Sequence, residues 1–553
     1  MYGDRNTSYF HRVARMKAAT KQISMIKNGD TTYTDAASIE GHILDYFTGI
    51  FHSPHHCAPN DLVSTCIPSL VTPEDNDMLC KVPSASEIKA AVLDMNVDGA
   101  PDPDGFGGHF YHHFWDIIAH DVGLAVQEFF LHGKLVSNLN SNLIVLIPKV
   151  PGADNMGDLR PIALANFQFK LITKILADRL SLIATKIILE QQRDFIQGRH
   201  IFDCVIIASE AINVLNRRSF AGNLALKINI KKAFDTLDWS FFLLVLKSFG
   251  FRHVFCDWIL KILHSARLSI LVNYKAVGFF SCVRGVRQGD PLSPLLFCIA
   301  EEVLSRAICL AATLGRISPM NYCRGLSIPT HILYADDIMI FCKATKVNVR
   351  RILDIFSKYG EASGQLVNRN KSKYYAGAVF PTRLNVITAM LGFSMGSIPF
   401  MYLGCPIFEG KPKANHFQAI VDRIKVKLST WKRSLLSIMG RVQLVNSIIH
   451  GMLVYSIYLW PAALLKKVDA WIRNFIWSGD ISTQKVCTVG WKSVCRPLAS
   501  GGLGIRSVAS INESLILKLG WSFMANSDQW ARLCRCRFLR NNSPISYYIK
   551  SSV

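Results

Sequence analysis

Two adjacent aspartates, Asp336 and Asp337, stand between two apolar runs in residues 332–341, which read ILYADDIMIF. Apolar runs on both sides predict two strands, and a hairpin would place both carboxylates at its tip. Adjacent carboxylates repel each other, and a divalent cation relieves that repulsion. Two Mg²⁺ ions that lie about 3.5–4 Å from each other and are held by carboxylates activate a 3′-hydroxyl and stabilise a leaving pyrophosphate. The pair with its flanking strands indicates such metal-assisted chemistry, whereas an Asp pair alone would more often be an exposed turn.

Strand-like and helix-like segments alternate along the chain in a mixed order. Short apolar runs predict strands at residues 143–148, 224–230, 269–272 and 276–283, the last two paired around residues 273–275. Helical spacing of apolar residues predicts helices at 167–189, 203–215, 241–249 and 292–310. This order is typical of an α+β domain in which helices cover a palm-like sheet.

The chain of 553 residues carries 62 Lys and Arg against 40 Asp and Glu, a formal net charge of +22. Such an excess favours a polyanionic partner, with nucleic acid ahead of an anionic membrane. The most apolar stretch, residues 442–465, is interrupted by polar residues and a proline, so it predicts no membrane span. The first residues lack the apolar core of a secretory signal. We therefore expect an intracellular, soluble protein.

Residues 411–441 hold eight basic residues and one acidic residue, Asp422. The basic residues are Lys411, Lys413, Arg423, Lys425, Lys427, Lys432, Arg433 and Arg441. They lie among apolar residues at helical spacing. A solvated helix face is one interpretation and contact with nucleic-acid phosphates is the other, and the scarcity of acids places the two on an equal footing.

Three segments together resemble the palm motifs of reverse transcriptases. Residues 226–235 (LKINIKKAFD) are similar to the first motif, residues 284–297 (RGVRQGDPLSPLLF) to the second and residues 334–337 (YADD) to the third. Further segments resemble, in order, the enzymes of plant LINE-type (non-LTR) retrotransposons. These are residues 146–149 and 159–164 in the fingers, 363–372 after the Asp pair, 402–404 in the primer grip and 428–504 in the thumb and the region C-terminal to it.

The likeness covers nearly the whole chain and implies an α+β right-hand polymerase with fingers, a palm of mixed antiparallel sheet plus helices, and a helical thumb. The domains it implies are an N-terminal linker or extension (1–85), a fingers extension (86–140), fingers and palm (141–408), a basic helical thumb (411–480) and a remnant of the region leading to ribonuclease H (481–553). The family's upstream endonuclease and downstream ribonuclease H have no counterpart, so we expect a portion of a longer polyprotein.

An enzyme of this family is an RNA-directed DNA polymerase. The resemblance implies an RNA template, a DNA primer end and deoxynucleoside triphosphates as partners, two Mg²⁺ ions as cofactors, and a nuclear location without a membrane. Two other functions stay open. One is a catalytically dead remnant that still binds nucleic acid, and the other is an intron-maturase-like RNA-binding protein, against which the signatures in residues 431–504 argue.

The resemblance makes Asp336, Asp337 and position 229 the catalytic metal ligands, but position 229 is Asn229 where the family has a third carboxylate. An asparagine offers a hard cation one neutral carbonyl oxygen, so the site loses one of three charges that oppose two divalent ions. We expect weaker metal binding and a large fall in rate. Asp235 lies six positions further on and would need a rearranged backbone to substitute.

The remaining roles implied by the resemblance concern the nucleotide and the duplex. Phe234 would exclude a ribose 2′-hydroxyl, because a bulky ring there leaves room only for deoxyribose. Arg160 would meet the incoming triphosphate with its planar, always charged guanidinium. Lys371 is a further candidate for the pyrophosphate. Gln288 and Gly289 would lie under the template–primer pair, where a glycine lets the backbone approach closely.

Overall fold

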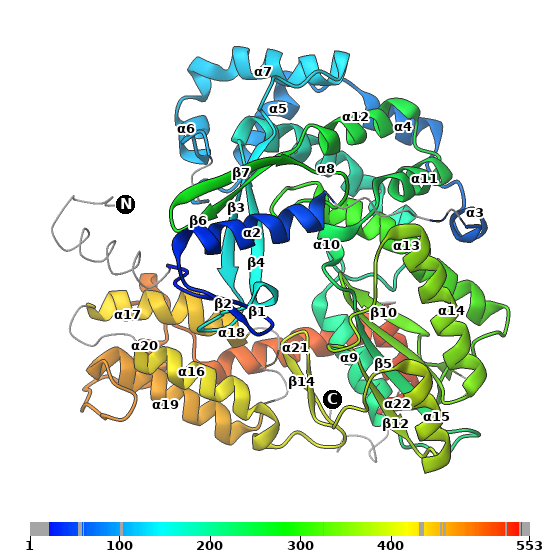
Figure 1. Cartoon of the computed structure of the whole chain (residues 1–553). Helices are drawn as coiled ribbons and strands as arrows, with labels where there is room; N and C mark the ends of the chain where they lie inside the picture. Colours follow the sequence, from blue (N-terminus) through cyan, green and yellow to red (C-terminus); the bar gives the residue numbers. More distant parts are fainter. Residues whose placement is uncertain are drawn as a thin grey trace. The chain divides into compact units, whose positions relative to one another are not determined.

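The computed structural model of the chain describes residues 22–52, 58, 60–99, 103–323, 326–430, 436–453, 456, 460–525, 528–540 and 543–544. The chain divides into two compact units, each made of three segments. The first unit comprises Met1–Gly198, Ile230–Leu310 and Leu353–Asn368. The second comprises Arg199–Asn229, Ala311–Ile352 and Arg369–Val553. Figure 1 labels the elements of both units along the colour ramp of the sequence.

The first unit contains a four-stranded sheet in the order β4–β3–β6–β7. Its strands are β3 (Ser141–Pro148), β4 (Leu159–Ala165), β6 (Arg267–Val272) and β7 (Lys275–Ser281). β3 pairs antiparallel with β4 and parallel with β6, and β6 pairs antiparallel with β7. Asn273 and Tyr274 connect β6 to β7 with φ values of 48° and 71°, as a two-residue hairpin turn requires. The predicted pair of strands around residues 273–275 is therefore confirmed.

Helices form most of the rest of the first unit. They are α2 (Ala36–Phe51), α3 (Leu62–Cys66), α4 (Pro73–Cys80), α5 (Ala85–Asp94), α6 (Gly108–His113), α7 (Trp115–His132), α8 (Phe167–Ile187), α10 (Ala233–Thr236), α11 (Trp239–Phe249), α12 (His253–His264) and most of α13 (Ser293–Thr313). A small hairpin of β1 (Ile26–Asn28) and β2 (Thr31–Tyr33) and a 3-10 turn, η1 (Met156–Asp158), complete it. The helices predicted from apolar spacing at 167–189, 241–249 and 292–310 are confirmed as α8, α11 and α13.

The second unit contains another four-stranded sheet, in the order β10–β11–β5–β12, with every neighbouring pair antiparallel. Its strands are β5 (Asn223–Asn229), β10 (His331–Tyr334), β11 (Asp337–Lys343) and β12 (Lys373–Gly377). β5 and β11 occupy the centre, and the apolar run from 224 to 226 in β5 is fully buried. A short apolar run without alternation is the pattern of a strand buried on both faces, which explains the prediction of a strand here.

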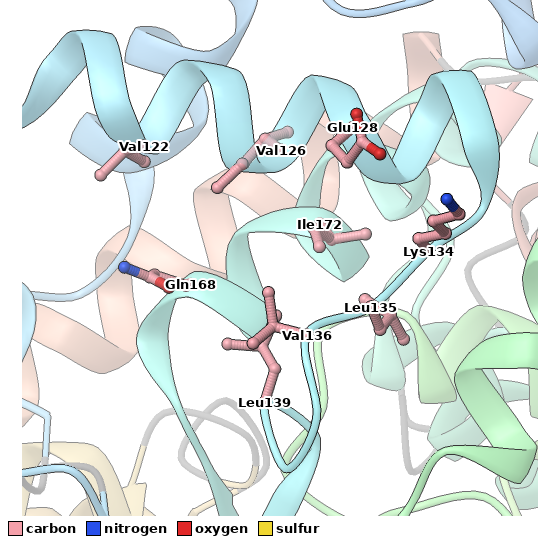
Figure 2. A pocket seen from close by; sticks show the side chains of 10 residues that line it. Val122, Val126, Glu128, Lys134, Leu135, Val136, Leu139, Gln168 and Ile172 are labelled. Atoms are coloured by element: carbon pink, nitrogen blue, oxygen red, sulfur yellow. The ribbon is translucent and has the colours of Figure 1, made fainter.

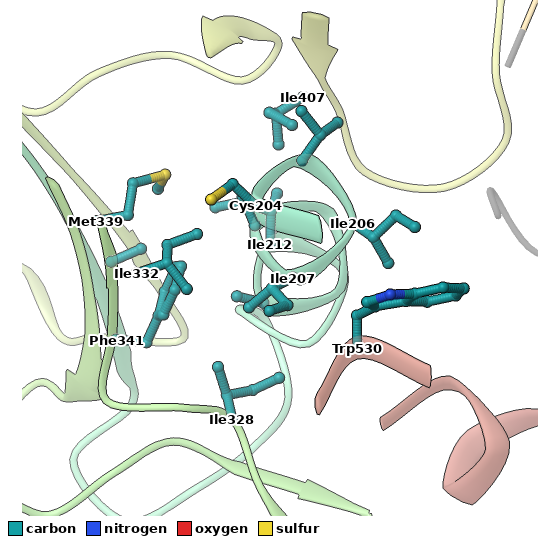
Figure 3. Packing of buried hydrophobic residues seen from close by; sticks show 14 of the residues in the cluster. Cys204, Ile206, Ile207, Ile212, Ile328, Ile332, Met339, Phe341, Ile407 and Trp530 are labelled. Carbon is teal, nitrogen blue, oxygen red and sulfur yellow. The ribbon is translucent and has the colours of Figure 1, made fainter. Parts of the chain in front are cut away.

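One hydrophobic core joins this sheet to helices from distant parts of the chain. α9 (Ile201–Asn213) lies between the sheet and α22 (Gln529–Phe538), as Figure 3 shows. Met339 and Phe341 of β11 approach α9 from one side, and Trp530 of α22 approaches from the other. Because α9 buries residues all round, it reads as a continuous apolar run from Cys204 to Ala208.

A second hydrophobic cluster holds a largely helical region of the same unit together. Buried members of this cluster include Ile424, Val445, Val468 and Ile472. The elements after β12 are α15 (Pro381–Leu391), β13 (Phe400–Tyr402), β14 (Cys405–Ile407), η2 (Ala414–Phe417), α16 (Gln418–Thr430), α17 (Ile438–Leu444), a π-helical turn (Val445–Ile449), α18 (His450–Leu453), α19 (Ala462–Ser478), α20 (Trp491–Val494), η6 (Leu498–Ser500), α21 (Val508–Ala525), α22, β15 (Leu539–Arg540) and β16 (Ser543–Pro544). The short strands β8 (Asn321–Cys323) and β9 (Leu326–Ser327) precede β10, and α14 (Lys346–Ser363) runs from one unit into the other.

Within the described part of the chain, every helix is too short or too polar to cross a membrane. The domain boundaries inferred from the family resemblance stay predictions. Of the eight basic residues in 411–441, Lys432 and Arg433 lie outside the described residues, as does Trp431.

Candidate active site

The carboxylates of Asp336 and Asp337 lie at the tight turn between β10 and β11. Tyr334 pairs with Asp337, so Ala335 and Asp336 form a two-residue turn. Ala335 has a φ of 46°, a left-handed conformation that costs a non-glycine residue roughly 1–2 kcal/mol. Both aspartates are half-buried. This is the hairpin that the apolar runs on either side predict.

Asn229 is the last residue of β5 and the Cα partner of Asp337 in β11. Its side-chain Nδ2 donates a hydrogen bond to Asp336 Oδ2 over 3.3 Å. Its backbone N–H donates to the hydroxyl of Ser372, at 3.2 Å, just before β12. The structure therefore brings positions 229, 336 and 337 together at one end of the sheet of the second unit.

The donor set at this end of the sheet consists of two carboxylates and an amide. Carboxylate and amide oxygens are ligands that Mg²⁺ accepts, and the carboxylates of Asp336 and Asp337 leave negative charge for it to neutralise. Asn229 turns its N–H group toward Asp336, and a half-turn of the amide would present Oδ1 instead. No three His, Cys, Asp or Glu side chains among the described residues form a metal-binding group. The oxygen atoms of Asp336, Asp337 and Asn229 are nevertheless of the kind that a divalent ion accepts, and this set offers one negative charge fewer than three carboxylates would.

Residues 402–404, which resemble a primer grip, lie in a small hairpin of β13 and β14 in the second unit. Tyr402 pairs with Cys405, and Leu403 and Gly404 form the turn with φ values of 48° and 80°. The Tyr402 side chain is fully buried. Burial raises the pKa of Tyr402 well above its usual value, and the nearby charge of Asp337 adds to this effect. Lys227 of β5 donates from Nζ to the carbonyl oxygen of residue 401 at 2.9 Å, which ties this hairpin to the central strand.

Phe234 lies in α10 of the first unit and is half-buried. Its ring stacks on that of Phe297 in α13, with centroids 4.4 Å apart and an interplanar angle of 17°. Lys232, just before α10, has a φ of 51° and reverses the chain there. Phe297 thus gives the ring of Phe234 a flat support, and its role as a ribose gate stays a prediction.

Asp235 follows Phe234 and is almost completely buried. Its Oδ1 accepts a hydrogen bond from Gln288 Nε2 at 3.4 Å. Burial raises the pKa of Asp235 to about 6, although Lys232, the Gln288 hydrogen bond and Lys149 all favour its ionised form. Burial likewise lowers the pKa of Lys232 to about 8, against the attraction of Asp235. The Asp235 carboxylate therefore interacts with the Gln288 amide through a hydrogen bond and with the positive charges of Lys232 and Lys149.

Gly289 has a φ of 114°, and a Cβ built on it would lie 2.6 Å from the carbonyl oxygen of Ala163 in β4. The N–H of Ala163 donates to the carbonyl oxygen of Gln288 at 2.8 Å. The segment 288–289 therefore packs directly on β4. This packing requires glycine at 289 for a reason internal to the protein, independent of any duplex.

The two remaining predicted site residues carry exposed cations. Arg160 lies in β4 opposite Ile147 of β3, in the first unit. Lys371 lies in the turn before β12, in the second unit. Their predicted contacts with a triphosphate and a pyrophosphate stay predictions.

The sequence reasoning missed two residues of the first unit, Tyr46 and Lys232. Lys232 Nζ lies 4.0 Å from the centroid of the Tyr46 ring, a cation–π contact. Tyr46 belongs to α2, which is distant in sequence from the palm motifs. No local pattern could have linked the two, because the contact depends on how α2 packs.

A hollow of about 330 Å³ lies between α7 and α8 of the first unit (Figure 2). Its lining is mainly apolar and includes Val122, Val126, Leu139 and Ile172. None of the predicted site residues lines it. The chemistry predicted from the sequence is therefore not located in this hollow.

Residues 147–407 match the family model described as reverse transcriptase (RNA-dependent DNA polymerase). The match contains both four-stranded sheets apart from most of β3, and it contains the hairpin of Asp336 and Asp337. Residues 147–407 are therefore similar to reverse transcriptases, and the mixed α+β fold is consistent with the fold of right-hand polymerases.

Proteins of transposable elements are among the relatives of this chain. It is 24% identical over 539 residues to an uncharacterized 149 kDa protein of transposon TX1 from Xenopus laevis, covering 96% of this chain and 40% of the relative. It is 24% identical over 440 residues to the Retrovirus-related Pol polyprotein from type-2 retrotransposable element R2DM of Drosophila melanogaster, covering 77% and 39%. It is 32% identical over 125 residues to a putative ribonuclease H protein of Arabidopsis thaliana, covering 22% and 20%. The chain thus spans two fifths or less of these relatives, and its homologues include proteins of non-LTR retrotransposons.

Proposed function

We propose that this chain is the RNA-directed DNA polymerase portion of a plant LINE-type retrotransposon, impaired by Asn229. It would copy an RNA template from a DNA primer end with deoxynucleoside triphosphates, in the nucleus. The observation that carries the proposal is the position of Asn229, whose Nδ2 lies 3.3 Å from Asp336 Oδ2 and whose Cα is paired with that of Asp337. This proximity supports a third ligand at position 229 beside the two carboxylates.

In this proposal Asp336 and Asp337 hold two Mg²⁺ ions, and Asn229 adds at most one neutral oxygen. Bound Mg²⁺ supplies Lewis acidity for the attacking 3′-hydroxyl and the leaving pyrophosphate. Phe234, whose ring stacks on that of Phe297, would exclude a ribose 2′-hydroxyl.

The other predicted site residues bind charged groups and the duplex. Arg160 binds the triphosphate and Lys371 the pyrophosphate. Gln288 and Gly289 form a backbone floor under the template–primer pair, resting on β4 through Ala163.

The domains proposed from the family resemblance are an extension (1–85), a fingers extension (86–140), fingers and palm (141–408), a thumb (411–480) and a remnant of the region that leads to ribonuclease H (481–553). The exposed side chains of Arg423, Lys425 and Lys427 on α16 support a thumb that touches phosphates.

A primer-extension assay with RNA template, DNA primer, deoxynucleotides and Mg²⁺ tests the proposal. We expect little or no product from the chain as it stands. Asn229→Asp restores the third charge and should raise the rate about 10²-fold or more, the scale of one electrostatic contact to a transition state. The same substitution should tighten Mn²⁺ binding, measured by electron paramagnetic resonance of free Mn²⁺.

Two control variants make this test specific. Asn229→Ala removes the amide without adding charge and should stay inactive. Asn229→Asp combined with Asp336→Asn should lose the gain, because it again leaves two carboxylates. Primer extension by the unchanged chain at the same measurable rate as by Asn229→Asp would contradict the assignment of position 229.

A catalytically dead remnant that binds nucleic acid is the second candidate, and the loss of a carboxylate at Asn229 favours it. The two candidates differ in one outcome. If Asn229→Asp also makes no product while nucleic acid still binds in a salt-dependent manner, the remnant is the better description.

A further inference from the structure

Two segments of the first unit that are far apart in sequence are held together by backbone hydrogen bonds. Val286 N–H donates to Phe234 O, and Gly285 N–H donates to Leu237 O, both at 2.7 Å. Asp238 and Arg284 form an isolated antiparallel bridge. The backbone of the predicted gate, Phe234, is therefore bonded directly to the segment that leads to Gln288.

Gly285 brings the two segments into close contact. It has a φ of 83°, and a Cβ built on it would lie 2.6 Å from the carbonyl oxygen of Asp235. Trp239 Nε1 donates to the carbonyl oxygen of Gly285 at 2.8 Å, in a buried position. These contacts leave no space for a side chain at residue 285.

The side chain of Asp235 makes a polar contact between the same two segments. Its carboxylate is buried and accepts from Gln288 Nε2 at 3.4 Å. The positive charge of Lys232, three residues earlier, favours the ionised form of Asp235, and Lys232 Nζ lies 4.0 Å from the centroid of the Tyr46 ring. A buried charge needs such a partner and a hydrogen bond, because burying it alone is costly.

We propose that Asp235 is a positioning residue that holds the Phe234 segment and residues 284–289 as one rigid body, through the hydrogen bond that its side chain accepts from Gln288. This inference rests on the proposed function, because it assigns what that rigid body is for. It couples the side chain that excludes a 2′-hydroxyl to the side chain that lies under the template–primer pair. The carboxylate itself touches neither nucleotide nor metal in this role.

Hydrogen–deuterium exchange on the full chain tests the rigid body without any catalysis. Asp235→Ala should speed amide exchange across residues 284–289 about tenfold, the effect of losing one hydrogen bond to a charged acceptor. Asp235→Asn keeps an acceptor oxygen and should change exchange there about twofold or less. Glu302→Gln is the matched control, since Glu302 is a fully buried carboxylate of the same unit that pairs with Arg306 at 3.0 Å.

If Asp235→Ala and Glu302→Gln change exchange at 284–289 equally, Asp235 is a general stabilising residue and holds nothing in particular. If Asp235→Ala does not fold, Gln288→Leu removes the other partner of the same hydrogen bond. Gln288→Leu should then speed amide exchange across residues 284–289. Unchanged exchange in Gln288→Leu would overturn the proposal.

A second arm uses the Asn229→Asp background and measures kcat/KM for dCTP divided by that for CTP. Adding Asp235→Ala should lower this ratio about tenfold, because the Phe234 ring is then no longer held in the position that excludes a 2′-hydroxyl. Adding Asp235→Asn to the same background, in place of Asp235→Ala, should keep most of the dCTP-to-CTP ratio. An unchanged ratio overturns the coupling to the gate. If Asn229→Asp makes no product at all, the proposed function fails, while the exchange arm still decides the role of Asp235.

Discussion

The carboxylate of Glu210 in α9 lies 2.5 Å from the guanidinium of Arg537 in α22, across 327 residues of chain. The Glu210 side chain is fully buried, and that of Arg537 is 13% exposed. Nearby, the ring of Trp530 meets that of Phe202 edge-on, with centroids 6.3 Å apart. The end of the described chain is therefore part of the core behind the sheet that carries Asp336 and Asp337.

Removing Arg537 should destabilise the second unit. Arg537→Ala leaves the buried Glu210 carboxylate without this countercharge, which costs about 3–5 kcal/mol when a buried pair is broken. Urea unfolding followed by circular dichroism measures the loss. Arg532→Ala, at an exposed arginine of the same helix, is the control and should cost less than about 1 kcal/mol. Equal losses in both variants would show that the Glu210–Arg537 pair contributes nothing specific.

Glycine at 289 should be required by the fold as well as by any duplex. Gly289→Ala puts a Cβ 2.6 Å from Ala163 O at a φ of 114°, so we expect a loss of about 1–3 kcal/mol in unfolding free energy. Gly157→Ala is the control, because nothing lies within 4 Å of its added Cβ and its φ is ordinary. If the two variants unfold at the same urea concentration, the close approach of residue 289 to β4 is wrong.

The Asp235 carboxyl should leave a signature in the pH dependence of stability. Burial raises its pKa from 3.8 to about 6, so between about pH 4 and 6 the folded chain binds a proton that the unfolded chain does not. The unfolding free energy therefore rises from this group as the pH falls through that window, by at most about 3 kcal/mol. Subtracting the profile of Asp235→Asn isolates the group, since that variant has no titrating side chain at 235. A flat difference between pH 4 and 6 would show that the carboxyl is not buried.

The exposed cations of α16 should account for part of the salt dependence of nucleic-acid binding. Replacing Arg423, Lys425 and Lys427 together by Gln should reduce the slope of log affinity against log salt by about 0.7–0.9 for each phosphate that the variant no longer neutralises. The matched control replaces three exposed lysines of the first unit, Lys89, Lys247 and Lys261, by Gln. A change of slope that is equal in both triple variants would assign the effect to net charge alone.

Local sequence patterns were sufficient for many of the elements and for the hairpin of Asp336 and Asp337, whereas the other candidate site residues came from the family resemblance. The two apolar runs around Asp336 and Asp337 specify a hairpin because strand propensity and a tight turn are both local properties. The same holds for the strand at 224–230 and the helices at 167–189 and 292–310, each recognised from its own periodicity. The strand predicted at 224–230 includes Asn229, which is the last residue of β5 in the structure.

The tertiary structure alone decided which of these residues meet. β5 and β11 are separated by more than one hundred residues, and only their pairing register sets Asn229 opposite Asp337. The contacts of Asp235 with Gln288, of Lys232 with Tyr46 and of Glu210 with Arg537 likewise join segments with no common pattern. The physical reason is that periodicity reports which face of an element is buried, whereas the partner of that face is chosen by the packing of the whole chain.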